Sequence, residues 1–150
     1  MAENNEQLES QVENAVELHG HLGPFLVIGV RMGIAATEFL KSESHNRNMK
    51  VQVELPLRTP FSCILDGIQV TTHCTLGNQR LKVKKSPGRI SARFASTDSD
   101  KALAITVNPE IVREVREGMS KGATNESLAE TIASTSESRL LSFDMTKKRR

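Results

Sequence analysis

The sequence is poor in aromatic residues and in cysteine. Its 150 residues include five Phe and two Cys, with no Trp and no Tyr. Two cysteines exclude a disulfide framework and a structural zinc site made of four thiolates. So few aromatic side chains, with no helix rich in Lys and Arg, argue against a nucleic-acid interface that stacks bases. A chain of this length can bury a core without such staples, so a bound metal would serve function.

Long apolar runs are also lacking. The most apolar segment, 24–36, is interrupted by Arg31 and is shorter than the roughly 20 residues that a membrane span needs. Because Gly29 and Gly33 allow close backbone packing, we predict a helix buried inside the domain. The N-terminal segment has no basic stretch followed by an apolar one, which predicts a cytoplasmic protein without a membrane association.

Charge is distributed unevenly along the chain. The formal net charge is only +2, but residues 1–49 carry seven acids and three bases, whereas residues 50–93 carry two acids and eight bases. We therefore expect one acidic and one basic face.

Hydrophobic periodicity predicts one α+β domain over residues 1–150. Apolar residues recur at helical spacing in five segments, namely 8–18, 24–36, 61–72, 109–122 and, more weakly, 125–141. Alternation predicts strands over 51–55, 81–83, 90–94 and 103–107. We interpret 81–94 as a hairpin turning at 86–88 with a basic outer face. The order predicts an α-β-α-β-β-β core with a mixed sheet, helices on one face and further C-terminal helices.

The first candidate site is the sequence His19-Gly20-His21, just before the buried helix. An H-x-H pair in an extended segment points both imidazoles to the same side, which suits Zn²⁺ or another divalent transition metal. A helix N-terminus also disfavours the charged imidazolium and so keeps the rings able to bind metal. Hydrogen-bonded structural histidines are an equally good interpretation of the pair.

The second predicted helix carries the other candidates. Cys63 and Cys74 are eleven residues apart, about 16 Å along a continuous helix, so at most one of them can join a mononuclear site. Cys74, at the end of the helix, is the better candidate, and Cys63 suits a small buried position. Asp66 and His73 share a stripe with Gln69, where they could move protons, support a metal ligand or form a solvated face.

Two motifs together resemble the E-type component family of formylmethanofuran dehydrogenase: HGHLGPFLVIGVRMG at 19–33 and CILDGIQVTTHCTLG at 63–77. That family pairs HGHxCPG with a C-x-x-D-(A/G)-I-Q segment ending in GCTLG, and the resemblance runs from about residue 16 to 107. It implies the α-β-α-β-β-β fold, frequent homodimers, a one-carbon context and a metal site. The positions that it marks are His19, His21, Cys63, Asp66 and Cys74.

Two departures limit the resemblance. Gly23 stands where the family usually has cysteine, and His73 stands where it usually has glycine. No cysteine follows Cys74, so the zinc ribbon that many relatives append is not expected, and a free-standing relative is.

These observations support two hypotheses. In the first, His19, His21 and Cys74 hold one zinc-like ion with an open position, and Asp66 or His73 moves protons on a formyl or other one-carbon substrate. In the second, the metal is lost with Gly23 and the chain is a non-catalytic scaffold. It then binds an acidic partner or an anionic ligand through a basic hairpin that carries Lys82, Lys84 and Arg93. The two hypotheses differ in whether the chain is an enzyme.

Overall fold

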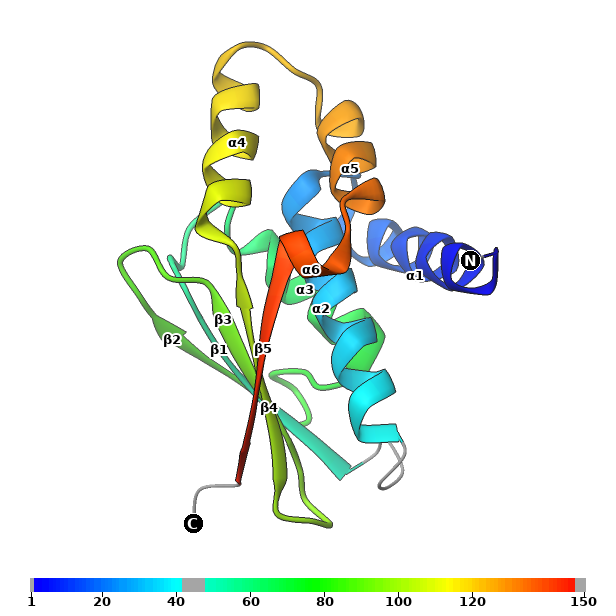
Figure 1. The fold of residues 1–150 in the computed structure, drawn as a ribbon, viewed down its shortest axis with the longest axis vertical. Coiled ribbons are helices and arrows are strands. Elements are labelled where there is room, and N and C mark those ends of the chain that lie inside the picture. Colours follow the sequence, from blue (N-terminus) through cyan, green and yellow to red (C-terminus); the bar gives the residue numbers. More distant parts are fainter. Residues whose placement is uncertain (1, 42–47, 148–150) are drawn as a thin grey trace.

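The computed structural model describes residues 2–41 and 48–147 as an α+β fold, as predicted. The described strands form one mixed sheet with the spatial order β2-β1-β3-β4-β5. The strands are β1 Met49–Leu55, β2 Leu81–Lys85, β3 Ser91–Ser96, β4 Lys101–Val107 and β5 Leu141–Lys147. The helices are α1 Ala2–His19, α2 Pro24–Lys41, α3 Cys63–Thr72, α4 Pro109–Ser120, α5 Asn125–Ser134 and α6 Glu137–Leu140. Helices α1, α2 and α3 lie on one side of the sheet (Figure 1).

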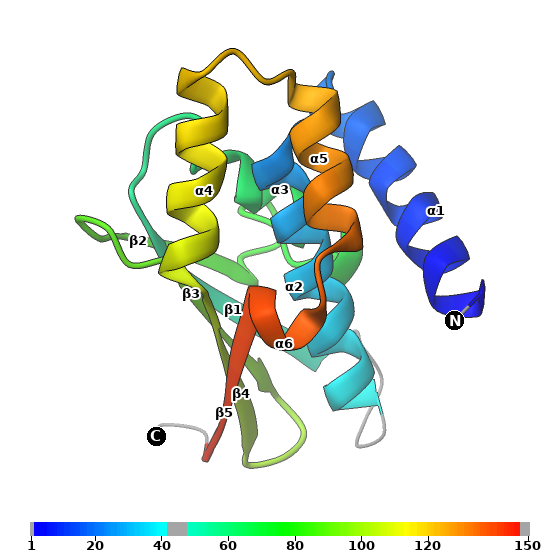
Figure 2. The same cartoon turned by 45° about the horizontal axis from the view of Figure 1, so that its top comes forward.

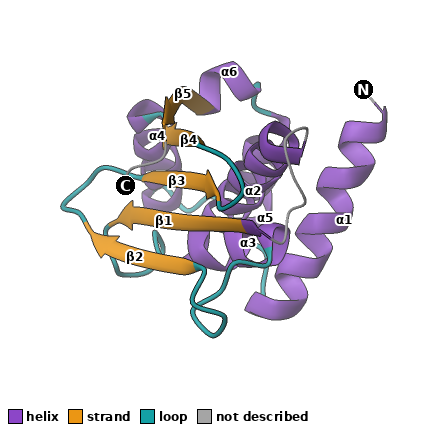
Figure 3. Ribbon diagram, turned by 90° about the horizontal axis from the view of Figure 1, so that it is seen from below, coloured by secondary structure: helices purple, strands orange, loops and turns teal. Residues whose placement is uncertain are grey.

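Helix α2 is the centre of the helical layer, as its apolar sequence predicts. It begins at Pro24, a residue suited to the first turn of a helix. Phe25, Ile28 and Met32 are buried in the core that the helices share with the sheet. On another side α2 packs against α1, which is separated from the sheet by the other helices (Figure 3). A helix with neighbours on several sides has few positions for polar residues.

Glycines let α2 and α3 approach until their backbones touch. A Cβ atom added at Gly29 would lie 2.1 Å from the carbonyl oxygen of Ile64, and one added at Gly67 would lie 2.5 Å from the carbonyl oxygen of Leu26. Neither residue has room for a side chain. The prediction of a close backbone approach is therefore confirmed at Gly29, and the partner helix is the one that carries Asp66.

The prediction of a hairpin over 81–94 is wrong. Strand β1 lies between β2 and β3, pairing in parallel with β2 and antiparallel with β3 (Figure 3). Since β1 and β2 are joined through α3, their parallel pairing is a crossover rather than a turn. The basic face survives this change, because Lys82 and Arg93 both pair in register with Gln52 of β1.

Strand β5 is the element that the sequence pattern did not predict. We interpreted residues 125–141 as a continuous weak helix, but α5 ends at Ser134, and the short helix α6 leads directly into β5. Strand β5 pairs antiparallel with β4, with Phe143 opposite Ile105 and Met145 opposite Leu103. It forms one edge of the sheet.

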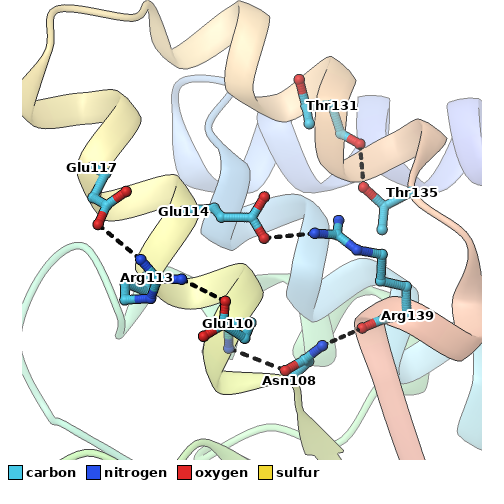
Figure 4. A network of polar contacts seen from close by, with 8 residues as sticks. All are labelled: Asn108, Glu110, Arg113, Glu114, Glu117, Thr131, Thr135 and Arg139. Carbon is cyan, nitrogen blue, oxygen red and sulfur yellow. Dashed lines mark hydrogen bonds and ion pairs between the residues drawn. The ribbon is translucent and has the colours of Figure 1, made fainter.

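Polar contacts hold the C-terminal helices in place (Figure 4). The side chain of Asn108 caps α4 by accepting a hydrogen bond from the backbone N–H of Glu110, and its Nδ2 donates to the carbonyl oxygen of Arg139. Helix α5 lies beside α2 (Figure 2). There the Arg31 guanidinium donates to the carbonyl oxygens of Ile132 and Thr135, which belong to the end of α5.

The described helices are too short or too polar for a membrane span. Within 2–41 and 48–147, none combines the length and the apolar character that crossing a bilayer requires.

Candidate functional site

The strongest polar contact between distant parts of the chain joins His19 and Asp66. His19 is the last residue of α1, and Gly20 follows with a φ of +100°, which turns the chain toward α2. Asp66 lies in the first turn of α3. The distance between Nδ1 of His19 and Oδ2 of Asp66 is 2.6 Å. The other carboxylate oxygen, Oδ1, accepts a hydrogen bond from Nε2 of Gln69 at 3.1 Å, so both oxygens of Asp66 are held.

This contact determines the chemistry of the second ring nitrogen of His19. An ionised carboxylate only accepts hydrogen bonds, so the Nδ1 of His19 carries the hydrogen, and Nε2 of the neutral ring presents a lone pair. That Nε2 atom is buried and has no hydrogen-bond partner among the described residues. A buried polar atom without a partner is rare and calls for an explanation, such as an absent ion or ligand. A carboxylate bonded to the far nitrogen is the usual support of a metal-binding histidine.

His21 lies beside His19, as the H-x-H spacing predicts. The two ring centroids are 4.6 Å apart and the rings are tilted by 39°. His21 is exposed, unlike the imidazole of His19, whose side chain is 14% exposed. A Cβ atom added at Gly23 would lie 4.0 Å from Nε2 of His21 and closer to nothing else outside its chain neighbours. There is therefore room for a side chain at position 23, directed at His21.

Cys63 is the cysteine at the same end of α3 as Asp66. It is the first residue of the helix, one turn before Asp66, and it is partly buried. Burial raises the pKa of the Cys63 thiol, and the nearby carboxylate of Asp66 raises it further. In the absence of a metal, the sulfur is thus held mainly in the neutral form, in which it is a poor ligand and a poor nucleophile.

Removing the charge of Asp66 should make Cys63 more reactive. In a Cys74→Ser background, Asp66→Asn is expected to speed alkylation of Cys63 by iodoacetamide, because a lower pKa leaves more thiolate at a given pH. Rates measured across neutral and alkaline pH would show the profile displaced toward lower pH. The exposed Glu130→Gln on α5 is the control and should leave the rate unchanged. An unchanged rate in Asp66→Asn would show that the carboxylate does not act on this thiol.

Cys74 and His73 lie beyond the opposite end of α3. Cys74 follows Asp66 by eight residues, about 12 Å at the rise of a helix. Its thiol is buried and donates to the carbonyl oxygen of Met49 at 3.2 Å. His73 is exposed and ends the helix with a φ of +60°. The structure brings neither residue to the contact between His19 and Asp66.

A complete set of metal ligands is not gathered by a single copy of the chain. Within the described residues, no group of three or more His, Cys, Asp or Glu side chains is placed to hold a metal ion. What the structure does gather is two imidazoles, a carboxylate that orients one of them, and the thiol of Cys63 nearby. The sequence pattern allowed Gln69 to be merely solvent-facing, but its hydrogen bond makes it part of this group.

Comparisons with known proteins agree on one family. Residues 18–145 match the family described as "FmdE, Molybdenum formylmethanofuran dehydrogenase operon". Over 100 residues the chain is 35% identical to a probable S-adenosyl-L-methionine-binding protein of Archaeoglobus fulgidus. This match covers 67% of this chain but only 27% of that protein, so the chain spans about a quarter of its relative's length.

A solved structure supports the fold. The crystal structure of an FmdE-like protein of tungsten formylmethanofuran dehydrogenase, from Syntrophus aciditrophicus, superposes with a TM-score of 0.67. The superposition covers 95% of this chain and 73% of that one, at 22% sequence identity. At that identity the likeness is one of fold.

Proposed function

Because the chain belongs to the FmdE family, we propose that it is a divalent-metal-binding domain whose ligands include His19 and His21. The observation that carries the proposal is the buried Nε2 of His19, which has no hydrogen-bond partner in the described chain while Nδ1 is bonded to Asp66. Zinc or a similar borderline metal suits imidazole ligands.

The proposal assigns each residue of the site a role. His19 supplies Nε2, Asp66 fixes the tautomer and orientation of that ring, and Gln69 fixes Asp66. His21 supplies the second imidazole. The family context favours a formyl or other one-carbon substrate, for which a bound ion would polarise the carbonyl oxygen or activate water. Asp66, with both oxygens engaged, acts on His19 rather than as a free proton carrier, and a role for His73 stays a prediction.

Two imidazoles do not complete a metal site, so further donors are part of the proposal. Catalytic zinc sites use about three protein ligands, and a single copy of the described chain does not gather three. Water, substrate, Cys63 or residues of a second copy in a homodimer would fill the remaining positions. Cys74 is left out of the ligand set because its thiol is bonded to Met49.

Metal content is the property that tests the proposal. We expect wild-type protein purified anaerobically to retain about one zinc-like ion per chain, and His21→Ala to retain none while staying folded by circular dichroism. Asp66→Asn should keep the site but weaken metal affinity by about 10- to 100-fold. Cys74→Ser is the matched control and should leave the stoichiometry unchanged. Equal metal content in the wild type and in His21→Ala would contradict the ligand assignment.

Gly23→Cys separates this proposal from the scaffold alternative. A thiol at position 23 has space to point at His21 and would add a third donor. If the wild type holds metal, this variant should hold it more tightly. If only Gly23→Cys holds metal, the natural chain has lost its site, which favours a scaffold that binds an anionic partner through Lys82, Lys84 and Arg93. In that face Lys84 lies 3.9 Å from Glu54.

S-adenosyl-L-methionine is a second candidate ligand, suggested by the name of the Archaeoglobus fulgidus relative. Because the matched part is about a quarter of that protein, this ligand needs a binding measurement on the present chain. Such a measurement is part of the experiment below.

A further inference from the structure

A second cavity, separate from the histidine site, is surrounded by arginines. It has a volume of about 610 Å³ and lies between the loop after β1, the turn that joins β2 and β3, and the first two turns of α4. These three segments meet at one end of the sheet (Figures 1 and 2). The volume is within the range of pockets that bind drug-sized molecules.

The interior of this cavity is apolar. Phe61, Ile90 and Val107 line it and are buried, and Val112 of α4 adds a partly buried side. Among the described residues that line it, none is acidic. An occupant would therefore place an apolar body against these side chains.

The rim of the cavity is strongly basic. Arg58, Arg89, Arg113 and Arg116 all line it, and they come from three different segments. The guanidinium of Arg58 lies over the ring of Phe61, 5.2 Å from its centroid, and that of Arg116 lies 4.9 Å from the same centroid. One aromatic ring thus holds two cations at the opening of an apolar cavity.

The four guanidiniums differ in whether an anion already pairs with them. Arg113 is paired with Glu110 and Glu117 of its own helix (Figure 4). Across residues 2–41 and 48–147, the guanidiniums of Arg58, Arg89 and Arg116 make neither an ion pair nor a hydrogen bond with the protein. Cations collected around one cavity repel one another, so an anion bound among them would be stabilised by all three.

We propose that this cavity binds an organic anion that carries a diphosphate-like group on a planar apolar body, as a nucleotide does. Guanidinium groups bind phosphate oxygens in pairs, and Phe61 with its neighbours receives the apolar body. The site is independent of the histidine site in its ligands. The two adjoin only through Phe61, whose ring packs edge-on against Phe25 at a centroid distance of 5.3 Å.

Four probes that share or lack each part of this chemistry test the proposal by isothermal titration calorimetry. ADP has both the diphosphate and the planar base, pyrophosphate has only the charge, adenosine has only the body, and S-adenosyl-L-methionine has adenosine with a sulfonium cation. We expect ADP to bind at least about tenfold more tightly than each of the others, and its affinity to fall as NaCl is added. EDTA in every buffer makes the result independent of bound metal.

Variants locate the binding. Arg58→Met and Arg116→Met retain apolar cover on Phe61 but remove the charge, and each should weaken ADP binding at least about tenfold. Arg139→Met, an exposed arginine outside the cavity that pairs with Glu114, should bind ADP like the wild type. Absence of ADP binding, equal binding by the cavity variants, or tighter binding of pyrophosphate or S-adenosyl-L-methionine than of ADP would each overturn the proposal. Metal content is unaffected by these outcomes, so the failure of one proposal does not imply failure of the other.

Discussion

Gly29→Ala is expected to lower the free energy of unfolding by about 3 kcal/mol, the largest change among the substitutions considered. The added methyl carbon would lie 2.1 Å from the carbonyl oxygen of Ile64. That oxygen belongs to the backbone of α3, so the clash cannot be relieved by rotating a side chain. Within an isolated helix the same substitution would stabilise by about 1 kcal/mol. The steric term is larger, so the helices must separate.

A second helical glycine provides the control for this prediction. A Cβ atom added at Gly118 of α4 would meet Cδ2 of Leu128 at 2.9 Å, which is the far end of a flexible side chain. Gly118→Ala should therefore change stability by less than about 1 kcal/mol. Since the chain has no Trp and no Tyr, urea unfolding is followed by far-ultraviolet circular dichroism. Equal unfolding midpoints for the two variants would refute the close backbone contact.

Arg31→Met is expected to lower the free energy of unfolding by about 2–3 kcal/mol. Methionine preserves the length of the side chain, but it cannot donate to the carbonyl oxygens of Ile132 and Thr135. These carbonyls lie at the end of α5, where a positive charge also interacts favourably with the helix dipole. Burial lowers the pKa of Arg31, opposed by the carboxylate of Glu137, so the charge that is lost is partly desolvated.

An exposed arginine gives the comparison. Arg139 pairs with Glu114, but both side chains are about half exposed, and exposed ion pairs contribute about 0–1 kcal/mol. Arg139→Met should therefore destabilise less than Arg31→Met in the same urea experiment. If the order is reversed, the two bonds from Arg31 to α5 do not hold the helix in place.

The helices and the apolar core could be predicted from the sequence because each depends on local periodicity. Pro24 marks the start of α2, and Asn108 followed by Pro109 marks the start of α4, both as predicted. Strand pairing is different, since the alternation in β2 fits equally well beside β1 or β3. The choice depends on the crossover through α3, which no pattern within β2 reveals.

The C-terminal strand illustrates a second limit. Leu141, Phe143 and Met145 alternate with polar residues, which is a strand signal. They follow the helical residues of α6 without a proline or glycine to separate them, so the helical interpretation extended too far. Pairing with β4 decides the conformation of this segment, and that pairing is a long-range contact.

Only part of the candidate site could be predicted in the same way. The pairing of His19 with His21 follows from their spacing. The contact between His19 and Asp66 depends on the angle at which α1 crosses α3, which also decides that Cys63, and not Cys74, lies at the histidine end of the helix. The arginines of the second cavity come from three segments, so no spacing along the chain could have brought them to attention.

The antiparallel pairing of Val107 with Leu141 has a consequence for how this fold can vary. The chain leaves the sheet after β4 and returns beside the same point, and Asn108 fastens the two ends of the excursion together through its backbone and side chain. Residues 109–140 can therefore change in length or content while the sheet register is preserved. Arg116 belongs to this excursion, so descendants of one sheet could exchange their ligands by replacing a module anchored at its base.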